Sequence, residues 1–210
     1  MQLPRIWLIT MPEAAGGPVP AIAEALEGCP AGLVGVQLRA KRVGDRQLVA
    51  WGRQLRAITR LSGALLLVNG RPDVAQIVQA DGVHLGEAGL PANQVRASWE
   101  GCSCIGASRH SRPGLLGALA EGADFAFLSP VFAVPEKSVP LGMAGFAEQI
   151  AGVGLPTYAL GGVGSEHVAD LVRAGAAGVA IRRALYEAAR PRDALRRFVD
   201  ELDKTAPHGE

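Results

Sequence analysis

The sequence predicts an α/β fold, a single-domain (β/α)8 TIM barrel. Short β-type runs alternate with longer helix-type runs about eight times in 210 residues, and strictly alternating units require parallel strands joined by right-handed crossovers. The apolar run 64–68 ends abruptly at Asn69 and Gly70, as a strand buried on both faces does. Eight such units indicate a compact barrel, because a doubly wound open sheet usually has fewer strands and a Gly-rich first turn.

The expected strands follow from apolar runs in chain order. They are IWLI (6–9), LVGVQL (33–38), ALLLV (64–68), GVHL (82–85), CIGA (104–107), FAFL (125–128), TYAL (157–160) and GVAI (178–181). Between them, apolar residues recur three and four positions apart, which is typical of amphipathic helices, and 45–61 is the clearest case. No Pro/Ser-rich linker or charge run divides the chain, so we expect one domain over 1–205 and a frayed tail over 206–210.

Composition restricts the class of function. The chain has 21 basic and 20 acidic side chains, a net charge of +1, and 49% hydrophobic residues. This balance favours a soluble globular protein and not one that binds nucleic acid or an anionic membrane. Pro4 and Arg5 interrupt the apolar length of a signal peptide, no apolar run reaches the roughly 20 residues of a membrane span, and the three cysteines lack zinc-ligand spacing. We therefore expect a cytoplasmic protein that binds a small molecule, with the oligomeric state left open.

The turn after the seventh expected strand is a candidate phosphate site. Gly161 and Gly162 let the backbone approach a ligand closely, and the helix that follows offers free N–H groups and a positive dipole end. In (β/α)8 barrels, the loops after strands seven and eight commonly hold a substrate phosphate. Ile181 and Arg182 lie in the second of these loops, and Arg183 would add charge. The alternatives are a tight turn without a ligand and solvated arginines.

Six short strings occur in the order and spacing of one known family. They are VQLRAK (36–41), LLVNGRPDVA (66–75), ADGVHLG (80–86), IGASRHS (105–111), GADFAFLSPVF (122–132) and YALGGV (158–163). From about Ile6 to Leu185, the chain resembles the thiamine phosphate synthase/TenI family, which implies a single (β/α)8 barrel acting in thiamine biosynthesis. The resemblance implies one of two activities. Synthases join a pyrimidine pyrophosphate to a thiazole phosphate using Mg²⁺, whereas TenI-like members isomerise a carboxylated thiazole phosphate or have no assigned activity.

Two positions depart from the synthase pattern. The resemblance implies an aspartate directly after Asn69 and a second acid shortly after the HLG string, and the first of these helps to hold Mg²⁺. This chain has Gly70 and Gly89 at the two positions. Mg²⁺ prefers carboxylate oxygens together with substrate phosphates, so a synthase site would need Glu87 or Asp73 as a displaced ligand.

The string VPEK (134–137) departs as well, because a typical synthase has Thr-x-Thr-Lys there. Only Lys137 is retained as a phosphate-binding residue, and the negative charge of Glu136 would repel a pyrophosphate. Together with the two glycines, this string disfavours the synthase reaction. We therefore expect no metal and no cofactor, with Mg²⁺ used only under the synthase alternative.

Among the histidines, His110 is the candidate catalytic base. It lies just past the fifth expected strand, and an imidazole that titrates near neutrality can remove a proton and return it elsewhere on a substrate. The alternative is that His110 only hydrogen-bonds the loop backbone. His84 is expected to be a satisfied residue at the rim, and His167 a solvated residue on a helix.

Arg39 and Lys41 leave the second expected strand at the same rim. A fork-like guanidinium suits a substrate carboxylate, and the alternative for Arg39 is a salt bridge to a loop acid such as Glu87. Gln37 and Asn69 end neighbouring strands, where each would hydrogen-bond a heterocycle or, alternatively, satisfy buried backbone groups.

Three functions follow from these observations. The leading expectation is a metal-independent thiazole phosphate tautomerase, an isomerase of the TenI-like kind, in which His110 moves the proton and Arg39 or Lys41 orients the carboxylate. The first alternative is a Mg²⁺-dependent thiamine phosphate synthase with a displaced metal site. The second is a catalytically silent barrel that binds a phosphorylated ligand in regulation.

Overall fold

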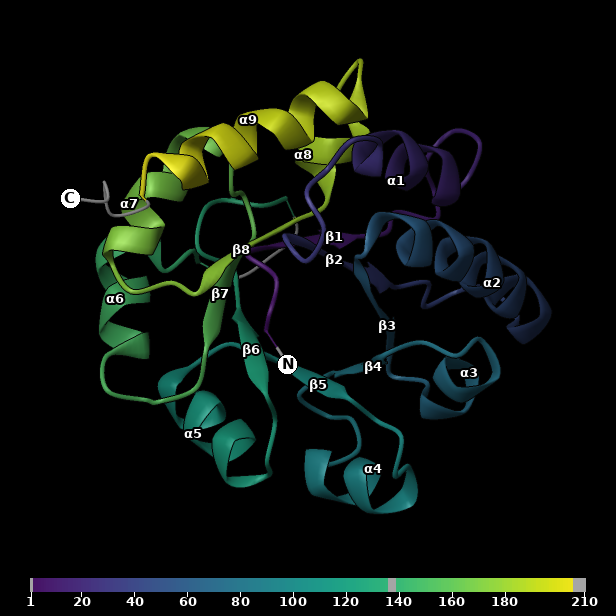
Figure 1. Cartoon of the computed structure of the whole chain (residues 1–210). Coiled ribbons are helices and arrows are strands. Elements are labelled where there is room, and N and C mark those ends of the chain that lie inside the picture. Colours follow the sequence, from purple (N-terminus) through teal and green to yellow (C-terminus); the bar gives the residue numbers. More distant parts are fainter. Residues whose placement is uncertain (1, 136–138, 206–210) are drawn as a thin grey trace.

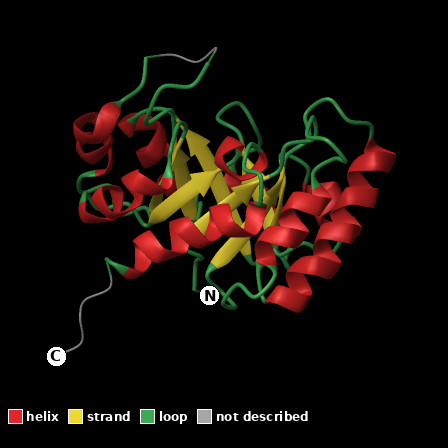
Figure 2. Ribbon diagram, turned by 90° about the horizontal axis from the view of Figure 1, so that it is seen from above, coloured by secondary structure: helices red, strands yellow, loops and turns green. Residues whose placement is uncertain are grey.

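Eight parallel strands form a closed barrel in the computed structural model, which describes residues 2–135 and 139–205. The strands pair in chain order from β1 to β8, and β8 pairs with β1 (Figure 1). Figure 2 shows the strands as an inner bundle with the helices outside it. The predicted (β/α)8 fold is therefore confirmed. The expected tail, 206–210, lies outside the described residues.

Strands and helices alternate along the chain as predicted. The strands are β1 Ile6–Ile9, β2 Val34–Leu38, β3 Leu65–Asn69, β4 Gly82–Leu85, β5 Cys104–Arg109, β6 Phe125–Leu128, β7 Thr157–Leu160 and β8 Gly178–Ile181. The helices are α1 Val19–Leu26, α2 Asp45–Ser62, α3 Pro72–Ile77, α4 Ala92–Ser98, α5 Arg112–Ala120, α6 Gly142–Ile150, a 3-10 turn Ser165–His167, α7 Val168–Arg173, α8 Arg183–Tyr186 and α9 Pro191–Asp203. The predicted strands agree with the observed ones to within two residues at either end.

The helix predicted over 45–61 forms as α2 and packs against the sheet through one face. Leu48, Leu55 and Thr59 on this face are buried, in keeping with the helical period of the sequence. The helix ends before Gly63, whose φ of 65° is a left-handed conformation that glycine adopts without strain. Within the described ranges, no helix combines the length and the apolar character needed to cross a membrane.

Aromatic side chains fill the interior of the barrel. Trp7 stacks on Phe125 with ring centroids 4.9 Å apart, and Phe127 and Tyr158 contact the same cluster. The Tyr158 hydroxyl donates a hydrogen bond of 2.6 Å to the Pro4 carbonyl oxygen. Because these rings occupy the interior, the barrel is a packed core and a ligand has room at the carboxyl ends of the strands.

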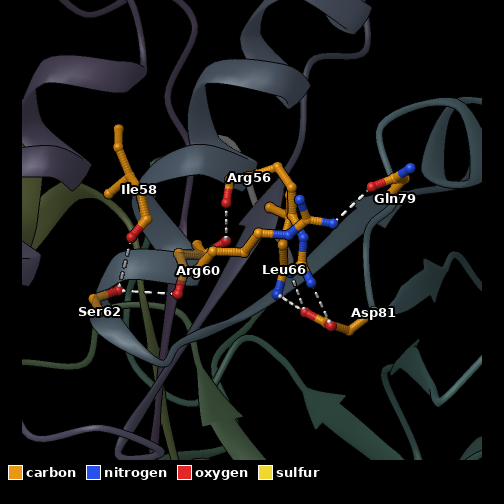
Figure 3. Close-up of polar contacts among 8 residues, drawn as sticks. Arg56, Ile58, Arg60, Ser62, Leu66, Gln79 and Asp81 are labelled. Carbon is orange, nitrogen blue, oxygen red and sulfur yellow. Dashed lines mark hydrogen bonds and ion pairs between the residues drawn. The ribbon is translucent and has the colours of Figure 1, made fainter.

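Ion pairs and hydrogen bonds join the elements at the amino-terminal end of the barrel (Figure 3). Arg56 of α2 donates to both carboxylate oxygens of Asp81, at 2.8 and 3.0 Å. Asp81 directly precedes β4 and also accepts a hydrogen bond of 2.7 Å from the Leu66 N–H of β3. Arg60 donates to the side chain of Gln79 nearby. These contacts bind α2 to two neighbouring strands.

Candidate active site

A pocket of about 640 Å³ opens at the carboxyl-terminal ends of the strands. Its lining brings together the predicted site residues that lie in the described part of the chain, although they come from strands far apart in sequence. These residues are Gln37, Arg39, Lys41, Asn69, His110, Gly161, Gly162, Ile181 and Arg182. Lys137 lies outside the described residues. The position of each residue at or just past a strand end explains why all of them face one cavity.

The inner wall of the pocket contains a histidine–serine pair. His84 is fully buried in β4, stacks on Phe127 with ring centroids 4.2 Å apart, and has its Nε2 2.8 Å from the Ser108 hydroxyl oxygen. Burial, followed by the positive charges of Arg109 and Arg39, lowers the pKa of His84 to about 3. The imidazole is therefore neutral near pH 7. This corrects the expectation of a rim residue, because His84 lies behind Ser108, which lines the pocket.

Gln37 is a second buried polar group of the pocket. Its side chain is 2% exposed, and its Oε1 has no hydrogen-bond partner among the described residues. A buried acceptor without a partner costs free energy, which a ligand N–H donor would recover. The sequence identified Gln37 as a site residue but gave no signal for Ser108, whose contact with His84 forms only in the folded protein.

His110 follows β5 and is held by a backbone carbonyl. Its Nδ1 lies 2.5 Å from the Ser129 carbonyl oxygen. Because a carbonyl oxygen only accepts, Nδ1–H donates this hydrogen bond and Nε2 takes no part in it. Nε2 lies 3.9 Å from a Glu87 carboxylate oxygen, and both side chains are about half exposed. The next residue, Ser111, caps α5 by accepting a hydrogen bond from the Gly114 N–H. His110 thus has a defined ring orientation beside the pocket.

Four basic side chains line the pocket, and we call them the basic rim: Arg39, Lys41, Arg182 and Arg183. Over the described ranges, none of the four forms an ion pair, and the salt bridge considered between Arg39 and Glu87 is absent. The Arg39 main chain is fixed by Thr10, whose hydroxyl accepts from the Arg39 N–H at 2.7 Å and donates to its carbonyl oxygen. The rim therefore presents positive charge to a ligand, with no ion-pair partner in the described ranges.

The expected glycine turn follows β7, and packing by itself also requires glycine there. Gly161 and Gly162 have φ values of 97° and 65°, and a Cβ on Gly162 would lie 2.7 Å from the Phe132 Cβ. His167 stacks on Phe132 and accepts a hydrogen bond from the Gly164 N–H, so it is not the solvated residue expected. This N–H is therefore engaged within the loop, and a larger residue at 162 would disturb the loop as well as any ligand.

As far as the chain is described, the donor set of the pocket does not fit a Mg²⁺ ion. Gly70 and Gly89 offer no carboxylate, and Asp73 is bound by Arg71 at 2.7 Å and does not line the pocket, so the displaced site through Asp73 is wrong. Among the described residues, Glu87 is the one carboxylate that lines the pocket. The same residues contain no group of three His, Cys, Asp or Glu side chains that could hold a metal ion. A hard cation that needs several oxygen ligands would face the basic rim instead.

The sequence matches one family, and one solved structure similar in both sequence and fold carries a related name. The model of a family described as thiamine monophosphate synthase (TMP-TENI) matches residues 6–185. A thiamine-phosphate synthase of Methanoculleus marisnigri is 44% identical over 149 residues, covering 70% of this chain and 71% of its own. One from Roseiflexus castenholzii is 34% identical over 93% of this chain and 86% of its own. The solved thiamine phosphate pyrophosphorylase of Pyrococcus furiosus superposes with a TM-score of 0.87 at 30% identity, covering 97% of both chains.

These names correct the leading functional expectation. The relatives are called synthases, which are transferases, so the expectation of an isomerase acting as a thiazole tautomerase is wrong, and the synthase alternative is the better supported one. The physical reason for the error lies at Gly70 and Gly89. Missing carboxylates remove ligands of a cation, but they leave in place the basic side chains that line the pocket.

Proposed function

The chain belongs to the thiamine monophosphate synthase/TenI family, and from this premise we propose that it is a thiamine-phosphate synthase. It would be a transferase that joins a pyrimidine pyrophosphate to a thiazole phosphate. The observation that carries the proposal is the basic rim, which lines a pocket of about 640 Å³ and forms no ion pair among the described residues. Two small substrates, each bearing phosphate, match this combination of space and charge.

The chemistry needs charge stabilisation more than proton transfer. The thiazole nitrogen forms a bond to the methylene carbon of the pyrimidine, while the bond from that carbon to the pyrophosphate oxygen breaks. The electron pair of the broken bond leaves with pyrophosphate, and the thiazole becomes a positively charged thiazolium. Preorganised cations near the leaving oxygen lower the barrier to such a step. The basic rim is the group of side chains suited to this role.

The inner wall of the pocket suits the heterocycles. Gln37 offers an unpaired acceptor, Ser108 a hydroxyl oriented by His84, and Phe127 an aromatic ring. Ring faces and a few polar groups are what orient small ligands in such pockets. His110, with Nδ1–H bound to Ser129, would act as an acceptor through Nε2 and orient a substrate rather than drive the bond exchange.

The test is an assay of the purified protein with both substrates together. We expect thiamine phosphate and pyrophosphate to appear in equal amounts, measured by chromatography and by a coupled pyrophosphate assay. Each substrate alone provides the control for hydrolysis. Binding of both substrates without any product would contradict the proposal and indicate a silent barrel.

A further inference from the structure

We propose that this chain performs the coupling without a protein-bound divalent cation, and that Arg182 together with Arg39 supplies the positive charge that stabilises the leaving pyrophosphate. The inference rests on the proposed function, because it concerns the same reaction in the same pocket. It starts from the mismatch between the carboxylate-poor pocket and the Mg²⁺ that the family resemblance implies.

The topology of the barrel brings the two arginines together. β1 pairs with β2 on one side and with β8 on the other, and Leu8 of β1 is level with both Val36 and Ile181. Arg182 directly follows Ile181, and Arg39 lies three residues beyond Val36. Because adjacent strands are about 4.8 Å apart, the backbones of β2 and β8 are separated by at most about 10 Å at this level. Both side chains line the pocket, and Arg182 is near enough for its charge to act on Arg39.

The charges around the pair support the same conclusion. Burial, followed by the positive charge of Arg182, lowers the pKa of Arg39, while Glu13 raises it. Glu13 is exposed and does not line the pocket, and Glu87 lies beside His110. In the described part of the chain, Glu13 is the one acid that offsets the repulsion between the two guanidinium groups. An anion bound between them removes this repulsion and gains charge-assisted hydrogen bonds.

Guanidinium groups can replace a metal ion in this reaction because only the leaving group needs activation. The bond between carbon and the pyrophosphate oxygen breaks, and its electron pair stays on that oxygen as negative charge. Two planar forks can each donate two hydrogen bonds to phosphate oxygens and remain protonated throughout. No proton, reductant or oxidant enters the step.

The experiment measures turnover and pyrophosphate binding after treatment with EDTA. We expect wild-type turnover to be the same in EDTA as in added Mg²⁺, and inorganic pyrophosphate to bind in EDTA by calorimetry. Arg182→Gln should lower kcat by about 10²-fold and abolish pyrophosphate binding in EDTA. The matched control is Arg46→Gln, since Arg46 is exposed, lies at the start of α2 and is outside the pocket lining. It removes the same charge and should leave both quantities unchanged.

Two results would overturn the inference. One is turnover that disappears in EDTA and returns with Mg²⁺, in which case the proposed function stands and the metal-free step fails. The other is Arg182→Gln binding pyrophosphate in EDTA as tightly as the wild type does. If no product forms under any condition, the proposed function fails. Calorimetry still decides whether the arginine pair binds pyrophosphate without a metal ion. Metal-free pyrophosphate binding that depends on Arg182 supports the pair, and absence of binding overturns it.

Discussion

At the amino-terminal end of the barrel Arg56 and Arg96 each bind an aspartate, whereas at the carboxyl-terminal end Arg39 and Arg182 bind no acid over the described ranges. Both ends are built from the same (β/α) units, so the fold does not impose this difference. An arginine paired with a carboxylate has its charge satisfied and serves stability. An arginine lining a pocket without such a partner has its hydrogen-bonding capacity left for a ligand.

The amino-terminal pairs repeat one arrangement. Asp124 directly precedes β6, binds Arg96 of α4 at 2.9 Å, and accepts a hydrogen bond of 2.6 Å from the Ile105 N–H of β5. Asp81, before β4, does the same with Arg56 and with the N–H of a β3 residue. The acid in each case ties a helix to two strands. Arg56 and Arg96 therefore serve to hold the amino-terminal end together, whereas Arg39 and Arg182 line the pocket.

The largest effect is expected for Arg39→Gln. Turnover should fall by about 10²–10³-fold, as when a transition-state donor is removed, while the free energy of unfolding should change by less than about 0.5 kcal/mol. The main-chain bond to Thr10 survives the substitution because it does not use the side chain. Steady-state kinetics and urea denaturation measure the two quantities. Arg56→Gln should show the reverse, with stability lost and turnover kept. Equal losses of turnover in both variants would end the distinction between the two ends.

The next effect is a loss of stability in acid, caused by the buried imidazole of His84. The pKa of His84 is about 3 in the folded protein and has an ordinary value of 6.5. Because the folded pKa is the lower one, His84 takes up a proton in the unfolded protein before it does so in the folded protein. The free energy of unfolding is therefore highest above pH 6.5 and decreases as the pH falls toward 3. The slope is at most about 1.4 kcal/mol per pH unit. Urea denaturation from pH 7 to 4 should show this slope in the wild type and its reduction in His84→Gln, and an identical slope in both would refute a neutral buried His84.

A smaller effect is expected for Asp81→Ala, which removes the partner of Arg56 and the acceptor for a strand N–H. The free energy of unfolding should fall by about 1–3 kcal/mol, since a partly buried charge and an N–H lose their partners. Turnover should be retained at temperatures where the variant is folded. The matched control is Asp73→Ala, because the Asp73–Arg71 pair is exposed and such pairs contribute about 0–1 kcal/mol. Equal losses in the two variants would show that the Asp81 arrangement has no special role.

The smallest effect is expected for Gln37→Leu. A ligand hydrogen bond to Gln37 contributes about 1 kcal/mol, so kcat/KM should fall by roughly tenfold or less. Stability should stay the same or rise slightly, because a buried acceptor without a partner is removed. Gln47→Leu, at an exposed position of α2, is the control. Unchanged kinetics in Gln37→Leu would remove Gln37 from the substrate site.

Strand and helix periodicity predicted the barrel, and with it the common location of Gln37, Arg39 and His110, because parallel strands of a barrel end at one rim. The pairing of residues across strands was beyond the sequence. His84 and Ser108 are 24 residues apart, and their contact depends on the register of β4 against β5. Likewise, the need for glycine at 162 comes from a different loop, which contributes Phe132.

The reaction was the part that the sequence predicted wrongly. Gly70 and Gly89 offer no carboxylate to a metal, but this does not exclude pyrophosphate chemistry when basic side chains line the pocket. Ion pairing decides which arginines are available for a ligand, and it is a property of the folded protein. Arg39, Arg56 and Arg71 look alike in the sequence, yet among the described residues Arg56 and Arg71 bind aspartates and Arg39 does not.

A crystal structure of the protein grown with inorganic pyrophosphate in EDTA is the most direct measurement. We expect the anion at the carboxyl-terminal end of the barrel, in contact with the guanidinium groups of Arg39 and Arg182, and no anion beside Arg56 or Arg96. Pyrophosphate at the amino-terminal end, or pyrophosphate bound only in crystals grown with Mg²⁺ and held through Glu87, would contradict the assignment of the basic rim as the ligand-binding end.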